Sequence, residues 1–109
     1  MIISMGNPLI LIVSNKDNRV SRFSTWLNQY DLTYADTAEE AINIFSNNYL
    51  KIRVVLLDLV LPDYSGIEVL IKMKALSKLS EIVIVSDQFD IQRAVDCIKK
   101  GAFDYLLFP

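Results

Sequence analysis

The sequence predicts a doubly wound α/β domain built on a five-stranded parallel sheet. Two observations predict this fold. Short apolar runs, typical of strands buried on both faces, alternate along the chain with segments of helical periodicity. Polar residues directly follow several of these runs, as expected at the carboxyl edge of such a sheet. Strands that alternate with helices in this way form a parallel sheet through right-handed crossovers.

Length and composition fit one domain and exclude several kinds of site. The chain has 109 residues, 52% of them hydrophobic, and a formal net charge of −2. It can therefore bury a full core, and it carries no basic footprint for nucleic acid. It contains no histidine, which excludes histidine catalysis and histidine ligation of metals. The single cysteine, Cys97, excludes an intrachain disulfide and a thiolate metal cluster.

Residues 1–7 are predicted to be a leader before a domain that spans residues 8–109. The leader has no basic region, and the apolar run after Pro8 is too short to span a membrane. We therefore expect a cytoplasmic protein without a membrane segment.

The elements follow in order along the chain. The predicted strands cover residues 9–13, 32–35, 53–57, 82–85 and 105–108. The four helices between them carry apolar residues at helical spacing: Val20, Phe23, Leu27 and Tyr30; Ala38, Ala41, Ile42 and Phe45; Ile67, Leu70 and Ile71; and Ile91, Ala94, Val95 and Ile98. Asp17 is predicted to cap or begin the first helix, Thr37 and Glu40 form a capping box for the second, and Gly101 suits the end of the fourth.

One face of the predicted sheet lacks part of its cover. The chain ends at Pro109, directly after the fifth strand, so the helix expected there is absent. A parallel sheet needs both faces buried. Either the chain is a fragment of a longer protein, or another subunit covers that face.

Polar residues gather where strands one, three and four end. They are Ser14, Asn15, Lys16 and Asp17 after the first strand, Asp58 after the third, and Ser86 and Asp87 after the fourth. These strands are neighbours at the switch point of a doubly wound sheet, where ligands bind. Asp58 is therefore expected to lie between Ser14–Asn15 and Ser86.

Two stretches carry a family resemblance. Residues 54–70, VVLLDLVLPDYSGIEVL, resemble the phosphoacceptor region of response-regulator receiver domains, and residues 99–109, KKGAFDYLLFP, resemble their last strand. The pattern D-x-x-x-P-x-x-x-G, from Asp58 through Pro62 to Gly66, is fairly specific. The resemblance covers the chain apart from the leader and implies a flavodoxin-like, CheY-like sheet of order 2-1-3-4-5.

The resemblance also implies roles for single residues. In this family a histidine kinase passes a phosphoryl group to an aspartate, which matches Asp58. The hydroxyl that grips the phosphoryl oxygens matches Ser86, and the carbonyl that binds Mg²⁺ matches that of Val60. The aromatic residue that follows the movement of this hydroxyl matches Tyr105.

The sequence departs from the family pattern at three charged positions. The acidic pair that holds Mg²⁺ falls on Ser14 and Asn15, and the lysine falls on Phe108. Pro109 matches a proline whose preceding bond is typically cis. Asn15 still offers an amide oxygen to a metal ion, but Mg²⁺ binding is expected to be weak or absent. We therefore expect a degenerate receiver, in which Asp58 is retained and Mg²⁺-dependent phosphorylation is weakened or lost.

Two neighbouring residues, Lys16 and Asp87, could compensate for the charges that are missing from the family pattern. Lys16 could pair with Asp58 in place of the missing cations, or it could be a solvated loop lysine. Asp87 could supply a replacement carboxylate or repel a phosphoryl group, or it could be a loop acid before the fourth helix. For Lys16 we favour a solvated loop lysine, and for Asp87 we favour a loop acid before the fourth helix.

The sequence is compatible with three functions, and we expect that the protein is not an enzyme. The first is a phosphorylation-independent two-component receiver that acts through protein contacts of Arg93, Lys99, Lys100 and Tyr105, as a homodimer or beside an attached output domain. The alternative is a working phosphoacceptor in a transcriptional response regulator, with a histidine kinase as partner and no direct nucleic-acid binding by this domain. A flavodoxin-like cofactor-binding domain is disfavoured because the turn after the first strand lacks glycine.

Overall fold

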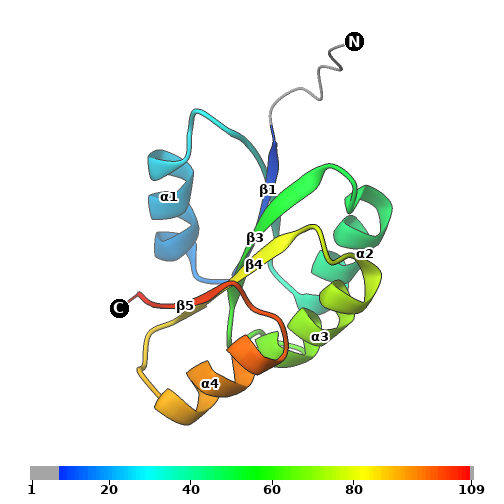
Figure 1. Ribbon diagram of the computed structural model, residues 1–109. Coiled ribbons are helices and arrows are strands. Elements are labelled where there is room, and N and C mark those ends of the chain that lie inside the picture. Colours follow the sequence, from blue (N-terminus) through cyan, green and yellow to red (C-terminus); the bar gives the residue numbers. More distant parts are fainter. Residues whose placement is uncertain (1–7, 109) are drawn as a thin grey trace.

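The computed structural model describes residues 8–108 and confirms the predicted sheet (Figure 1). Five parallel strands lie in the order β2-β1-β3-β4-β5. Their bounds are Leu9–Val13 for β1, Asp31–Ala35 for β2, Ile52–Asp58 for β3, Glu81–Ser86 for β4 and Asp104–Leu107 for β5. The predicted leader and the predicted cis bond before Pro109 lie outside the described residues.

Four helices connect the strands of the described chain: α1 (Asp17–Trp26), α2 (Ala38–Asn48), α3 (Gly66–Leu76) and α4 (Ile91–Lys99). Figure 1 shows α1 alone on one side of the sheet and α2 and α3 on the other. None of the four is long and apolar enough to cross a membrane.

The core has two unequal halves. The larger half joins α2, α3 and α4 to the sheet and includes Leu11, Val55, Leu57, Ile82, Ile84, Phe45, Leu70, Met73 and Cys97. The smaller half lies under α1, where Ile10, Ile12, Phe23 and Val85 are buried together. Because strand side chains alternate between the faces, neighbouring residues such as Ile10 and Leu11 enter different halves.

Local capping follows the sequence in most places. Thr37 caps α2, and its hydroxyl accepts a hydrogen bond from the Glu40 N–H at 3.1 Å. Gly101 follows the end of α4 with a φ of 107°, a left-handed conformation that glycine adopts without strain. Lys16, not Asp17, occupies the N-cap position of α1, and Asp17 is the first helical residue.

Five residues of the predicted apolar stripes are exposed and not core residues: Tyr30, Ile71, and Ile91, Val95 and Ile98 of α4, whose buried residue is Cys97. Tyr30 lies beyond the end of α1 and is exposed, because the helix ends four residues earlier. Ile71 is exposed on α3, whereas Val69 and Met73 are buried. The apolar residues of α3 surround much of the helix, so their spacing alone did not define the inner face.

The sheet face beside α1 carries an open apolar groove of about 580 Å³. Its lining comes from α1 and from strands β1, β3 and β5, and includes Ile10, Trp26, Val54, Leu56, Leu106 and Phe108. Half of the Trp26 side chain remains exposed there. The sequence predicted that one face of the sheet is incompletely covered but did not say which, and within residues 8–108 α1 is the one helix on the face with this groove.

Candidate functional site

Asp58 lies at the centre of the carboxyl edge of the sheet. It is the last residue of β3, and its register places it beside Val85 of β4, while Leu57 pairs with Val13 of β1. Its exposed fraction is only 1%. The sequence-based placement of Asp58 beside the ends of strands one and four is therefore confirmed.

Both oxygens of the Asp58 carboxylate accept hydrogen bonds from side chains. The hydroxyl of Ser14 donates to Oδ2 at 2.6 Å. The guanidinium of Arg19 donates through Nη1 to Oδ1 and forms a buried ion pair with it. The Arg19 side chain is 5% exposed, so the pair is largely shielded from water.

Arg19 also reaches the end of β5. Its Nη2 donates to the backbone carbonyl of Phe108 at 2.9 Å. One guanidinium therefore joins the ends of β3 and β5 from the first turn of α1. Sequence reasoning missed Arg19, although its spacing of four residues from Phe23 placed it on the inner stripe of the helix.

The two residues proposed as compensation meet each other at the rim. Lys16 Nζ lies 3.8 Å from Asp87 Oδ2, and both side chains are well exposed. Neither forms an ion pair with Asp58 in the described structure. Asp90, just beyond Asp87, caps α4 by accepting the Arg93 N–H at 3.2 Å.

The hydroxyl of Ser86 faces the loop after β4. It donates to the carbonyl of Gln88 at 2.9 Å and accepts from the Gln88 N–H at 3.2 Å. The Tyr105 hydroxyl donates to the same carbonyl at 3.2 Å. These two residues are thus joined through Gln88 rather than to Asp58, beside an open pocket of about 290 Å³ that both help to line.

The Phe108 ring packs against two aromatic side chains of α1, Phe23 and Trp26. Its ring centroid lies 4.8 Å from that of Phe23 and 5.7 Å from that of Trp26. The guanidinium carbon of Arg22 lies 4.4 Å from the Phe108 centroid, and that of Arg19 lies 5.6 Å from it. Both distances are within the range of cation–π attraction.

Among the residues expected to bind Mg²⁺, Asp58 is the one that offers a carboxylate. Asn15 is exposed, and Ser14 offers a hydroxyl that is already bonded to Asp58. Val60, the proposed carbonyl ligand, lies in the loop after β3, where it bridges to Ser65. Within residues 8–108 no three acidic, cysteine or histidine side chains gather as a metal site, and the one central carboxylate is paired with Arg19.

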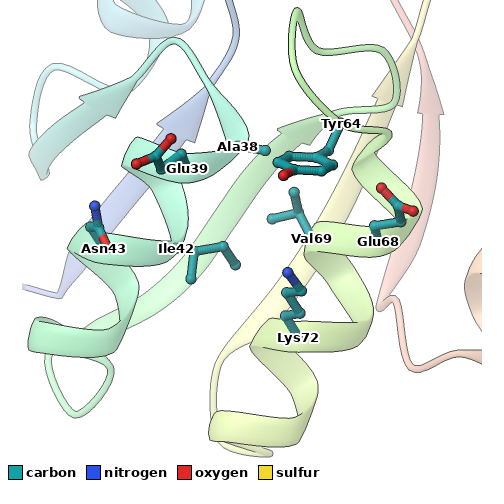
Figure 2. A pocket seen from close by; sticks show the side chains of 8 residues that line it. All are labelled: Ala38, Glu39, Ile42, Asn43, Tyr64, Glu68, Val69 and Lys72. Atoms are coloured by element: carbon teal, nitrogen blue, oxygen red, sulfur yellow. The ribbon is translucent and has the colours of Figure 1, made fainter.

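A second, smaller pocket of about 180 Å³ lies between α2 and α3. Figure 2 shows Glu39 and Asn43 on α2, Glu68 and Lys72 on α3, and the Tyr64 ring across the space between the helices. Lys72 Nζ lies 5.7 Å from the centroid of this ring. The charged lining groups are not buried, and Asp58 does not line this pocket.

Asp63 fastens the loop after β3 to the beginning of α2. Its carboxylate accepts the N–H groups of Ala38 at 2.8 Å and Glu39 at 3.0 Å. Desolvation alone would raise the pKa of Asp63, but the backbone N–H groups of Ala38, Glu39 and Tyr64 lower it below its ordinary value. Asp63 therefore has a structural role in this turn.

The comparisons with known proteins agree with the geometry. The profile of the response regulator receiver domain matches residues 10–109. The Regulatory protein AtoC of Escherichia coli is 28% identical over 102 residues, which are 92% of this chain and 22% of AtoC. The two-component response regulator ORR5 of Oryza sativa is 31% identical over 108 residues, which are 95% of this chain and 80% of ORR5.

Solved structures give the same result for the fold. The CheY structure from Borrelia burgdorferi, described as a CheX-CheY-BeF3-Mg²⁺ complex, superposes with a TM-score of 0.86 at 26% identity. The alignment covers 94% of this chain and 78% of that chain. The described residues thus share the CheY-like sheet order as well as the matching profile. This chain belongs to the response regulator receiver domain family of two-component signalling.

Proposed function

We propose that this receiver acts mainly through protein contacts, with weak or absent Mg²⁺-dependent phosphorylation at Asp58. The observation that carries the proposal is the enclosure of the Asp58 carboxylate, whose two oxygens are bonded to Arg19 and Ser14. Phosphoryl transfer depends on positioning and charge neutralisation rather than on complex covalent chemistry. The attacking carboxylate oxygen must direct a lone pair at the phosphorus, and both oxygens of Asp58 already accept a hydrogen bond that lowers their nucleophilicity.

Charge neutralisation is reduced at the same place. Ser14, Asn15 and Phe108 stand where the family carries an acidic pair and a lysine. Removing one oriented group that stabilises a transition state costs about 10²–10³ in rate. Losing both the tightly held ion and the lysine would therefore slow transfer by several orders of magnitude, which is the basis for weakened Mg²⁺ binding in the proposal.

The proposed contact surface is formed by α4 and β5. Ile91 and Ile98 are exposed on α4, and Leu107 is exposed on β5. Arg93, Lys99 and Lys100 are also exposed along α4 and its end. Apolar side chains next to cations suit a protein partner with an apolar patch and acidic residues, with Tyr105 at the edge of this surface.

The proposed partners are a histidine kinase or another signalling protein, together with a second copy of the chain or an attached output domain. The apolar groove beside α1 supports the second part, because large exposed apolar areas mark interaction sites. The proposal includes no direct nucleic-acid binding by this domain and no membrane contact, since the net charge is −2. Its location would be the cytoplasm, where kinases have access to ATP.

The test is the intact mass after incubation with acetyl phosphate and Mg²⁺. Wild type and Asp58→Asn are compared beside a reactive receiver as positive control. The expected result is no phosphate-sized gain in the folded wild-type protein. A gain in wild type but not in Asp58→Asn would overturn the proposal and support the alternative, a working phosphoacceptor receiver of a transcriptional regulator.

A further inference from the structure

Arg19 and Asp58 are the two charged residues that are buried among residues 8–108. Charged side chains are almost never buried unless they are paired, because leaving water costs several kcal/mol for each ion. The two residues are 39 positions apart in the chain, so the fold itself brings them together. Such a pair at the functional edge of the sheet calls for an explanation beyond packing.

We propose that Arg19 is a resident cation, whose guanidinium holds Asp58 in place of the exchangeable Mg²⁺ ion and the lysine that the family resemblance implies. This inference deepens the proposed function, and it rests on that function only for the claim that Asp58 is seldom phosphorylated. The site would then be neutralised permanently by a side chain of α1. Its conformation would depend on Arg19 rather than on a kinase or on the Mg²⁺ concentration.

The geometry of the guanidinium suits this role. Nη1 donates to the Asp58 carboxylate while Nη2 donates to the Phe108 carbonyl at 2.9 Å. A planar fork with several donors can hold two acceptors in fixed directions, whereas an ammonium is a compact point charge. Arg19 therefore provides the charge at β3 and the connection to β5 with one group.

Phe108 completes the arrangement from the other side. Its carbonyl accepts from Arg19, and its ring packs against Phe23 and faces the guanidinium carbon of Arg19 at 5.6 Å. The backbone N–H of Phe108 donates to the Ser86 carbonyl at 2.7 Å, which holds the end of β5 beside β4. An aromatic residue at this position thus shields the ion pair, and a cation there would repel Arg19.

The poor match of the site to Mg²⁺ has the same cause. A metal ion approaching Oδ1 of Asp58 would have to displace the guanidinium, and Oδ2 is bonded to the Ser14 hydroxyl. Ser14 and Asn15 add no carboxylate at the positions of the acidic pair, and Asp87 at the rim is paired with Lys16. The Arg19 guanidinium at Asp58 and the uncharged residues Ser14 and Asn15 therefore both oppose the binding of Mg²⁺ at this site.

The test is chemical rescue of Arg19→Ala by methylguanidinium. The variant removes the cation and leaves a cavity beside a buried carboxylate, so its melting temperature should fall by about 10 °C or more. Methylguanidinium at about 30 mM, far below the molar range in which guanidinium salts denature proteins, should raise it again by several degrees. An equal concentration of NaCl controls for ionic strength.

Arg22→Ala is the matched control. Arg22 lies one turn further along α1, contacts the same Phe108 ring and is exposed, but it does not contact Asp58. It should melt within a few degrees of wild type and show no response to methylguanidinium. The double variant Arg19→Ala/Asp58→Asn should also show no response, because it lacks the charge that binds the probe.

Two results would overturn the inference. One is an Arg19→Ala protein that melts as high as Arg22→Ala, and the other is a rescue that persists without the Asp58 charge. If Arg19→Ala does not fold, Arg19→Lys is compared with Arg22→Lys, and an equal melting temperature of these two would overturn the role of the fork. The mass measurement after acetyl phosphate treatment tests a separate claim. Phosphorylation of the wild-type protein would refute the proposed function, whereas a rescue that depends on Asp58 would still establish Arg19 as the resident cation.

Discussion

The ion pair between Arg19 and Asp58 leads to a stability prediction with a defined size. Arg19→Met and Asp58→Asn each remove one charge and leave the other buried, in side chains that are 5% and 1% exposed. Breaking a buried pair in this way costs about 3–5 kcal/mol of the free energy of unfolding. Asp58→Asn should lie at the lower end of that range, because an amide oxygen still accepts from Ser14.

The double variant should lose much less free energy of unfolding than the sum of the losses in the two single variants. Without either charge, no uncompensated ion remains, and the coupling energy is expected at about 1–3 kcal/mol. Urea unfolding followed by circular dichroism measures it from the midpoint at constant m-value. The exposed pair Lys16–Asp87, at 3.8 Å, is the control, with a coupling of about 0–1 kcal/mol that high salt removes.

Additivity of the two single variants within about 0.5 kcal/mol would refute a direct interaction between Arg19 and Asp58, because additivity is the behaviour of groups that do not interact. A coupling energy that is the same in the buried cycle and the exposed cycle would also contradict the prediction. Arg19→Gln, which also removes the charge, replaces Arg19→Met where the latter unfolds completely, since a domain of this kind is stable by only about 5–15 kcal/mol.

Three further predictions follow from other parts of the molecule. Cys97 is fully buried, and burial raises the pKa of its thiol, so iodoacetamide at pH 8 should modify it only after unfolding; rapid labelling of the native protein would contradict this. Asp63→Asn should lower the melting temperature at pH 7. The difference in melting temperature from wild type should vanish as the pH falls through the lowered pKa of Asp63, because wild type then loses its carboxylate charge. A difference that is constant down to pH 3 would contradict this prediction. Gly66→Ala should cost about 1–3 kcal/mol in urea unfolding, because a Cβ at Gly66 would lie 2.3 Å from the Asp58 carbonyl oxygen, and unchanged stability would refute that clash.

The sheet could be predicted from the sequence because its signals are local. The strand pattern of Val and Leu residues before Asp58 is typical of a strand buried on both faces, and β3 extends over those residues. The polar residues that end strands one, three and four fall at one edge because parallel strands share their direction. The positions of Ser14, Asp58 and Ser86 at this edge therefore follow from the predicted topology.

Arg19 could not be predicted by the same rules, because patterns of apolar residues treat a charged position as surface. The sequence offers Lys16 as a substitute cation because it closely follows the first strand, but Lys16 pairs with Asp87 at the rim. Two features of the sequence together could have indicated Arg19. A lone carboxylate at a buried sheet edge needs a charged or hydrogen-bonding partner, and Arg19 is on the same helix face as the apolar residue Phe23. The orientation of the Ser86 hydroxyl toward Gln88 likewise depends on a loop that the sequence pattern does not define.

The charges explain why the departures from the family pattern occur together. The resemblance implies three carboxylates opposite one divalent ion and one lysine, which sum to zero, and Asp58 with Arg19 also sums to zero. A lysine at position 108 would add an unpaired cation beside Arg19, and an acidic pair at positions 14 and 15 would add two anions without a metal ion. A phosphoryl group on Asp58 would add negative charge that Arg19 alone does not neutralise, while Lys16 is already paired with Asp87. Under the proposed function, the guanidinium of Arg19 therefore stabilises the unmodified carboxylate, and the arrangement favours a single state of the domain.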